Sequence, residues 1–319
     1  MLKLNRKQEV YTIGGVKVGG QPGENPTFLL GTMFYNGHKI IEDRKTAKFD
    51  KKRAEELINQ QETLSDQTGV PGGLDLVANS TFEIEKYIEF VTSVTDMPFS
   101  IDIWTVEPKL GGAKYIAEHG LADRAIYSSI APWSKDIRKE IDTLKELKLK
   151  NAILVAFDMA DKSVEARVRL LDEKLLPWAK EAGFKNFLLD TAVLSIPSIS
   201  YSCLSNQRLK EKYGCPTGCA PSNGTDILKK EAEQKWEKVG FHGMDSAAHA
   251  LGAFLWNDWL LYGAIESAKW MFPAVAMANV LQATLEFPNP KDLPTDPNHP
   301  LNKLFAKDVA ELKKALGGA

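Results

Sequence analysis

The stretch AILVAFDMADKSVEARVRLLDEKLLPWAKEAGFKNFLLD, residues 152–190, decides the fold. It begins with the apolar run AILVAF, continues with helical periodicity over Val164–Ala182, and ends with a second apolar run, NFLLD. Short β-rich runs on either side of a helical segment are typical of parallel strands joined by a right-handed crossover helix. The stretch therefore predicts one strand–helix–strand unit of a parallel sheet.

The same unit repeats along the chain. The predicted strands are Thr27–Thr32, Gly73–Ala78, Pro98–Ile103, Arg124–Ser129, Ala152–Phe157, Asn186–Asp190, Cys215–Ala220 and Trp259–Tyr262. The predicted helices cover Lys51–Asp66, a segment from Phe82, one ending near His119, Lys135–Leu147, Val164–Ala182, one ending near Tyr213, Thr225–Val239, a segment from Asp245, and Ile265–Leu281. Eight units in series favour a closed (β/α)8 TIM barrel, and an open doubly wound sheet is the alternative.

The two ends of the chain extend beyond the eight units. Such barrels typically need about 250 residues, and this chain has more. Residues 1–20 are expected to form a leading β-hairpin that turns at Gly14 and Gly15. Residues 287–319 are expected to form a C-terminal extension that is rich in turns and then helical over Leu301–Leu316. We expect a single domain over residues 1–319.

Composition indicates an ordinary globular protein without a charged partner. Forty basic and 42 acidic side chains give a net charge of −2, which lends no support to binding of nucleic acid or of an anionic membrane. The apolar segment Gly252–Ala278 contains charged residues, so it predicts no membrane span. The three cysteines do not form a disulfide framework and fit a reducing, cytoplasmic location.

Small polar and acidic residues follow the predicted strands, where a barrel of this kind carries its chemistry. They are Thr32, Asn79, Asp102, Ser128, Ser129, Asp158, Asp190 and Asn223. Helix capping is the alternative role for each of them, and it explains Asp102 and Asp190 least well because both follow apolar residues within a strand. The set contains no Lys or Arg, which argues against a phosphate-rich substrate. Trp104 and Trp133 also follow strands and either line the mouth of the barrel or seal it.

No pattern of metal ligands stands out. His242 and His249 could share a helical face, but HExxH is absent and Cys215 and Cys219 lack a third neighbouring cysteine. Structural histidines and buried thiols are the favoured interpretation, and no metal site is predicted.

Four segments carry a resemblance to a known family. GGVKVGGQPGENPTFLLGTMFYNGHKII, LADRAIYSSI, LLDTAV and YGAIESAKWMFPAVAMA resemble the H subunit of tetrahydromethanopterin S-methyltransferase. They look closer still to its bacterial relatives, which move a methyl group between a corrinoid protein and tetrahydrofolate in glycine betaine demethylation. The resemblance implies a dihydropteroate synthase-like barrel that binds a reduced pterin in its mouth and often forms a homodimer.

The resemblance also implies roles for individual residues. Asp190 matches the carboxylate that holds the amino–amide edge of the pterin, and such an edge suits a bidentate acceptor. Asp102 matches an acidic pterin-binding residue after the third strand. Asn223, beside Ser222, matches an Asn that contacts pterin N5. Ser128 stands where the family has an Asn, so its hydrogen bond to the pterin has a shorter reach or passes through water.

The implied reaction is an SN2 transfer of a methyl group between methylcobalamin, carried by a corrinoid protein, and N5 of tetrahydrofolate. Asn223 and Asp102 are the predicted catalytic residues, because the enzyme must position N5 and manage its proton. The missing zinc ligands favour a pterin nitrogen over a thiol as acceptor. Tetrahydromethanopterin as the pterin, a non-catalytic scaffold that docks the corrinoid protein, and a dihydropteroate synthase are the alternatives. The last would need cations near the seventh and eighth strands, and GCPTGCAPSNG and WLLYGA have none.

Overall fold

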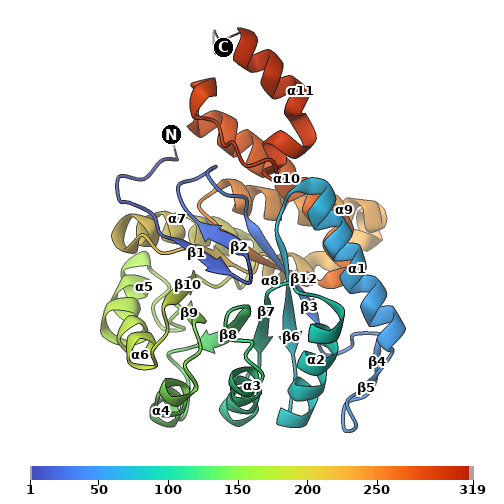
Figure 1. Ribbon diagram of the computed structural model, residues 1–319, viewed down its shortest axis with the longest axis vertical. Helices are drawn as coiled ribbons and strands as arrows, with labels where there is room; N and C mark the ends of the chain where they lie inside the picture. The colour runs from blue at the N-terminus through green and yellow to red at the C-terminus, as the bar shows by residue number, and fades with distance from the viewer. Residues whose placement is uncertain (1, 316–319) are drawn as a thin grey trace.

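The computed structural model describes residues 2–315 and contains a closed barrel of eight parallel strands (Figure 1). The strands are β3 Phe28–Met33, β6 Gly72–Val77, β7 Phe99–Asp102, β8 Ala125–Ile130, β9 Asn151–Val155, β10 Asn186–Asp190, β11 Thr217–Cys219 and β12 Trp259–Ala264. The barrel closes because β12 pairs in parallel with β3, for example at Leu260 and Leu29. The predicted TIM barrel is therefore confirmed, and the open doubly wound sheet is excluded.

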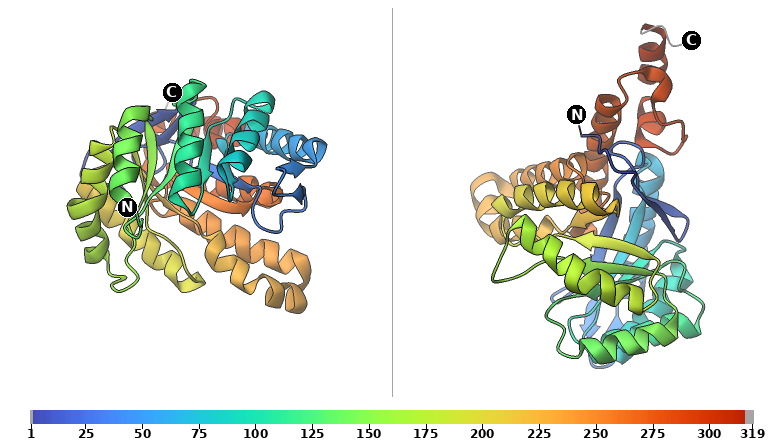
Figure 2. Two further views of the ribbon diagram at one scale, coloured as in Figure 1. Left: turned by 90° about the horizontal axis from the view of Figure 1, so that it is seen from below. Right: turned by 90° about the vertical axis from the view of Figure 1, so that its left-hand side faces the viewer.

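Helices surround the barrel, and each follows one strand (Figures 1 and 2). They are α1 Lys51–Thr68, α2 Thr81–Val94, α3 Val106–Glu118, α4 Ile137–Leu147, α5 Val164–Leu170 continuing into α6 Leu176–Glu181, α7 Ile196–Tyr213, α9 Lys229–Phe254 and α10 Ala268–Glu286. Local sequence explains where several of them begin. Asp50 accepts a hydrogen bond from the backbone N–H of Arg53 at the start of α1, and Ser80 does the same for Glu83 at the start of α2.

The region after β11 differs from the prediction. We expected helices over Thr225–Val239 and from Asp245; the structure has a short helix, α8 Ser222–Thr225, and then α9, which consists of two helical stretches on either side of a kink. The second stretch runs through Gly240 and Gly243 and buries Phe241. The helical geometry is interrupted at Glu237, whose φ is 57°, earlier than the predicted break.

The predicted N-terminal hairpin is present and closes the end of the barrel at which the strands begin. Strands β1 Val10–Ile13 and β2 Val16–Gly19 pair in antiparallel fashion around Gly14 and Gly15, whose φ values are 53° and 86°. Both values require the left-handed region that glycine adopts at little cost. Ile13 and Val18 pack in one apolar cluster with Phe28 and Trp259 inside the barrel. The hairpin thus plugs the end of the barrel at which the strands begin.

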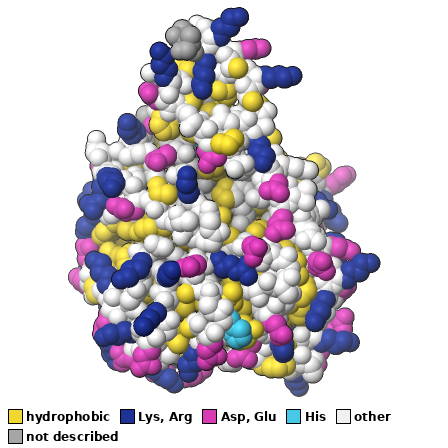
Figure 3. Space-filling model, viewed as in Figure 1, with side chains coloured by type: hydrophobic (Ala, Val, Ile, Leu, Met, Phe, Trp, Pro, Cys, Tyr) yellow, Lys and Arg dark blue, Asp and Glu magenta, His cyan; other side chains and the backbone are white. Residues whose placement is uncertain are grey.

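The C-terminal extension projects from this same end of the molecule (Figures 1 and 2). Helix α11, Pro300–Ala315, confirms the predicted terminal helix, except that its predicted last residue, Leu316, lies outside the described residues. Leu293, Leu301 and Val309 pack with the end of α10 in a small cluster of their own. None of the helices within residues 2–315 combines the length and apolar character that a membrane crossing needs. On the face shown in Figure 3, basic and acidic side chains are interspersed.

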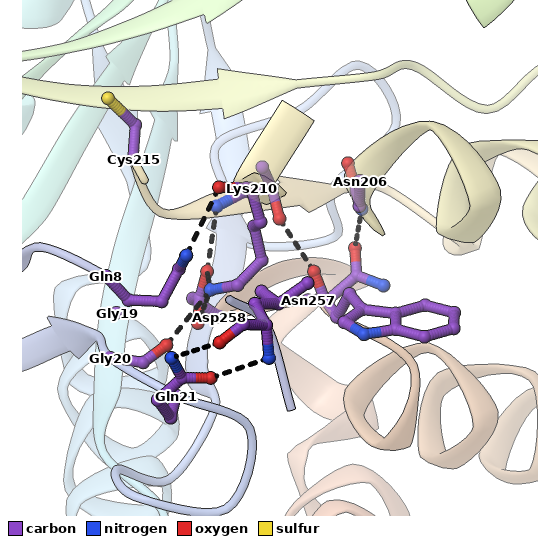
Figure 4. A network of polar contacts seen from close by, with 12 residues as sticks. Gln8, Gly19, Gly20, Gln21, Asn206, Lys210, Cys215, Asn257 and Asp258 are labelled. Atoms are coloured by element: carbon purple, nitrogen blue, oxygen red, sulfur yellow. Dashed lines mark hydrogen bonds and ion pairs between the residues drawn. The ribbon is translucent and has the colours of Figure 1, made fainter. Parts of the chain in front are cut away.

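A buried ion pair joins the hairpin, α7 and the strand starts (Figure 4). Lys210 on α7 is 1% exposed, and its Nζ lies 2.6 and 2.7 Å from the two carboxylate oxygens of Asp258. The same Nζ donates to the carbonyl oxygen of Gly20 at 3.2 Å, and Asp258 accepts from the backbone N–H of Thr217 at 2.9 Å. Burial raises the pKa of Asp258, and the Lys210 ammonium opposes this effect.

We expect Lys210→Ala to lower the free energy of unfolding by about 3–5 kcal/mol, because it leaves a carboxylate buried without its partner. Urea unfolding at neutral pH measures this loss. Lys212→Ala is the matched control, since Lys212 lies on the same helix and pairs with Asp172 at the surface. We expect a loss of about 0–1 kcal/mol there. Equal small losses in both variants would contradict a stabilising role for the buried pair.

Candidate active site at the barrel mouth

The alternation of side chains along the strands places two layers inside the barrel. An apolar layer lies nearer the strand starts, and a layer of acidic and small polar residues lies nearer the strand ends. Side chains two positions apart on a strand face the same side. The apolar interior cluster includes Phe28, Leu30, Ile126, Ile153, Val155, Leu188 and Trp259. Thr32, Ser128 and Asp190 each lie two positions after one of these residues, so they face the barrel interior at the end where the strands finish. Ser100 and Asp102 occupy the corresponding positions of β7, where Asp102 is aligned with Ser128.

Asp75, in the middle of β6, is an acidic residue of this layer that sequence reasoning missed. Its carboxyl is buried and accepts hydrogen bonds from the hydroxyls of Ser100, at 2.5 Å, and Thr32, at 3.1 Å. Burial, and next the negative charge of Asp102, raise its pKa well above the usual range. The available signal was a single acidic residue in the otherwise apolar run GGLDLV. Asp75 therefore holds its proton more tightly than an ordinary carboxyl does.

Asp102 ends β7 and opens onto the mouth. Its side-chain carboxyl makes no hydrogen bond to any residue within 2–315, so both carboxyl oxygens are available to a ligand. The surrounding barrel wall removes water from the carboxylate and raises its pKa, while the nearby Lys109 ammonium opposes the shift. Asp75 and Asp102 lie close enough to titrate as a pair, so a proton taken up by one is felt by the other.

Asp190 ends β10 and is half buried. Its Oδ1 accepts a hydrogen bond from the backbone N–H of Ala192 at 2.7 Å, and its Oδ2 has no partner among the described residues. Burial raises its pKa to about 6, the Asp102 charge adds to the increase, and the Ala192 N–H and the Arg167 guanidinium counteract it. Asp190 thus stabilises the turn after β10 with one oxygen and retains a free acceptor.

Lys109 is the second residue of the mouth that the sequence did not reveal. It lies on α3 and is buried, and its Nζ donates to the carbonyl oxygen of Ser129 at 2.6 Å. The same ammonium pairs with Glu140 at 2.9 Å. Ser128, the adjacent predicted site residue, is buried at the end of β8. Lys109 therefore anchors the end of β8 and brings a positive charge toward Asp102.

Asn223 and Ser222 lie on α8, just after β11. The Asn223 side chain is exposed and has no hydrogen-bond partner within residues 2–315. Ser222 is buried, and its hydroxyl donates to the carbonyl oxygen of Leu261 at 3.3 Å. Thr225 fixes the end of α8 through a 2.7 Å hydrogen bond to Asp245. Asn223 is thus an unpaired amide on a short, well-anchored turn, whereas Ser222 has a structural contact.

The histidines and cysteines have structural contacts. The His242 ring stacks on Trp270 with centroids 3.8 Å apart, and His249 is buried with its Nδ1 2.9 Å from the carbonyl oxygen of Asp245. All three cysteines are buried and free. Within residues 2–315, no cluster of three or more His, Cys, Asp or Glu side chains is arranged to hold a metal ion.

The fold and this mouth define a class: a (β/α)8 barrel whose acidic rim suits a polar ligand that donates N–H groups. The family model of the tetrahydromethanopterin S-methyltransferase MtrH subunit matches residues 6–288, and the chain belongs to this methyltransferase family. It is 38% identical to the H subunit of tetrahydromethanopterin S-methyltransferase from Methanothermobacter thermautotrophicus, over 96% of this chain and 100% of that protein. The H subunit from Methanosarcina mazei is 36% identical, over 95% and 100%.

A solved structure supports the fold. Dihydropteroate synthase of Yersinia pestis, solved with a pterine-sulfa conjugate, superposes with a TM-score of 0.59 at 11% identity. The match covers 87% of this chain and 100% of that chain. Similarity at this level of identity shows a shared dihydropteroate synthase-like barrel, and it confirms the fold that the resemblance implied.

The raised pKa of Asp75 predicts a dependence of stability on pH. Above about pH 4 the unfolded chain has released this proton while the folded protein keeps it. The free energy of unfolding should therefore fall as the pH rises, by up to about 1.4 kcal/mol per pH unit, until Asp75 ionises in the folded protein. Asp75→Asn removes this titration and should flatten the profile. Urea unfolding at several pH values between 5 and 8 measures both slopes.

The control for this experiment is Asp161→Asn, at an acidic residue whose pKa hydrogen bonds from Ser163 lower. Asp161 is ionised in both states over this pH range, so its replacement should leave the slope of the wild type intact. Parallel profiles for the wild type and Asp75→Asn would show that Asp75 does not retain its proton.

Proposed function

We propose that this protein transfers a methyl group between a methylated corrinoid protein and N5 of a reduced pterin bound in the barrel mouth. The observation that carries the proposal is the acidic layer, in which Asp102 and Asp190 present oxygens without partners in the described chain. The amino–amide edge of a pterin offers two parallel N–H donors, and ionised carboxylates are strong acceptors for them. Family membership supports the same reaction class.

Tetrahydromethanopterin is the pterin that we propose. The relatives at 36% and 38% identity are named after tetrahydromethanopterin. Their names give no support to tetrahydrofolate, which was the prediction from the sequence. Asp190, Asp102 and Asn223 would contact the bicyclic head of the pterin, which the two substrates share in outline. Tetrahydrofolate therefore remains the second candidate, and a direct comparison of the two pterins distinguishes them.

The side chains of the mouth would orient the pterin and manage one proton. In the direction that methylates the pterin, the N5 lone pair would form the bond to the methyl carbon, the bond between cobalt and that carbon would break with its electron pair remaining on the corrinoid cobalt, and N5 would lose its proton. Asp190 would hold the amino–amide edge, and Asn223 would hydrogen-bond N5 through its carbonyl or its amide. The raised pKa of Asp102 suits it to accept a proton from N5 and return it in the reverse direction. No protein nucleophile is needed.

Exposed aromatic and apolar side chains on the rim support a protein partner at the mouth. Trp104 is 81% exposed and Trp133 is 43% exposed, and their rings stack with centroids 6.2 Å apart. Met159 and Ile227, on two other loops of the same rim, are also exposed. Exposed apolar groups gathered around a site are typical of a docking surface. We propose that the corrinoid protein docks on this rim. The homodimer that the resemblance implies stays a prediction.

The test mixes the purified protein with methylcobalamin, or with a methylated corrinoid protein, and tetrahydromethanopterin or tetrahydrofolate. We expect loss of the methylcobalamin absorbance together with formation of the 5-methyl pterin. Asn223→Ala should slow this transfer by about 100-fold or more, the loss typical of a positioned catalytic group, and should change pterin affinity less. Pterin binding without turnover in the wild type would instead favour a non-catalytic scaffold. A weaker affinity with an unchanged rate would make Asn223 a binding residue.

Asp190→Ala should raise the dissociation constant of the pterin by roughly 10- to 100-fold, because a charge-assisted hydrogen bond worth about 1.5–3 kcal/mol is lost. Calorimetry under anaerobic conditions measures the change. Asp158→Ala is the matched control, since Asp158 accepts from the N–H of Ala160 at 2.8 Å, as Asp190 does from Ala192. Its replacement removes the same turn contact and should leave affinity unchanged. Equal effects in both variants would remove Asp190 from the pterin site.

A further inference from the structure

A cavity of about 310 Å³ lies beside the acidic layer, between the loops that follow β9 and β10. Phe157 and Ala192, which follow β9 and β10, are among the residues that line it. Ala192 lines this cavity, and its backbone N–H donates a hydrogen bond to Asp190. The cavity is therefore adjacent to the residue that we propose as the pterin anchor. Its volume lies at the lower end of the range for small-molecule sites. The proposed methyl transfer makes no use of it.

Arg167 gives the wall of this cavity a buried positive charge. The residue is 4% exposed, and its guanidinium donates to the carbonyl oxygens of Lys162, at 2.5 Å, and Thr191, at 3.0 and 3.3 Å. It forms no ion pair with any carboxylate within residues 2–315. Buried charges are normally paired, and here the hydrogen-bond partners are all carbonyl oxygens, while the Asp190 charge offsets part of the positive charge of Arg167.

Further features of the cavity favour an anion. None of the nine described residues that line it is acidic, and Lys162 stands at its edge as an exposed ammonium without an ion-pair partner in the described chain. Helix α7 begins at the cavity with Ser195 and Ser198 in the lining and has no acidic residue in its first turn. A helix N-terminus attracts negative charge. Three separate sources of positive potential thus converge on one space.

The same cavity also offers aromatic surface. Phe157 is buried, and the Arg167 guanidinium lies 5.8 Å from its ring centroid. Tyr201, on the first turns of α7, is 65% exposed and lines the outer part of the cavity. An aromatic ring of a ligand could pack between these side chains while a negatively charged group beyond it reaches Lys162.

We infer that this cavity binds the anionic, aryl-containing tail of the reduced pterin. The inference rests on the proposed function, in which Asp190 holds the pterin head next to this opening. Both candidate pterins carry an aryl group followed by negatively charged groups, so both tails have the required chemistry. The cavity would add affinity for the whole substrate without touching the reacting nitrogen.

The test compares three probes by anaerobic calorimetry: tetrahydromethanopterin, tetrahydrofolate, and 6-methyltetrahydropterin, which has the head without the tail. Lys162→Met should weaken binding of the tailed pterins about two- to fivefold. Tyr201→Ala should weaken it about two- to tenfold. Both variants should leave the affinity for 6-methyltetrahydropterin unchanged, and Lys162→Arg should retain the affinity of the wild type. Lys180→Met, an equal loss of charge at an exposed lysine in the last turn of α6, should change none of the three affinities.

The outcomes separate this inference from the proposed function. A loss confined to one of the tailed pterins supports the tail site and identifies which tail it accepts. Unchanged affinities for all three probes in Lys162→Met and Tyr201→Ala overturn the tail site while leaving the pterin head site intact. An equal loss for the tail-less probe also overturns it, because the residues would then act on the head. Failure of the wild type to bind any of the three pterins contradicts the proposed function itself.

Discussion

Desolvation of the carboxyl groups in the barrel mouth, reinforced by the negative charge of Asp102, is the constraint on which the chemistry depends. Closure of the barrel places Asp75, Asp102 and Asp190 on three strands that face one cavity, and the charge of Asp102 raises the pKa of both of the others. Two buried cations, Lys109 and Arg167, lie at the edges of this layer and offset part of the repulsion. The layer therefore tends to retain protons, and a ligand that donates N–H groups relieves the repulsion on binding.

The half of the barrel in which the strands begin holds these carboxyl groups in place. Phe28 and Trp259 fill the interior below them, and the N-terminal hairpin covers the end of the barrel with Ile13. Gly73 and Gly218 leave room for these rings, since a Cβ on either would lie 2.5 Å or less from the Phe28 or Trp259 side chain. With the lower layers packed and the strand starts tied by a buried ion pair, the strands cannot slide past one another. The positions of the acids at the upper end follow from this fixed register.

Much of this arrangement was predictable from the sequence, because apolar runs of strand length alternate with helical segments. Asp102 and Asp190 were found because each ends such a run. Asp75 was missed because its role depends on pairing of β6 with β7, which places Ser100 beside it, and register between strands is not visible in one sequence. Lys109 was missed for a similar reason, since its ammonium reaches Ser129 only through the packing of α3 against the barrel. Local sequence predicts the elements, and tertiary contacts determine which polar groups meet.

The three carboxyl groups are not equivalent, and their differences suggest a division of roles. Burial raises the pKa of Asp75, and the hydroxyl groups of Ser100 and Thr32, which donate to its carboxyl, oppose this increase. Asp190, with a pKa of about 6, is mostly ionised at neutral pH, as the acceptor that we propose for the pterin edge must be. Asp102 has a raised pKa because the barrel wall shields it from water, and its oxygens have no partner in the described chain. We propose that this carboxyl exchanges the proton with N5, because transfer in either direction must move one proton as the methyl group moves. Asp102 therefore matches the proton-transfer role better than its two neighbours do.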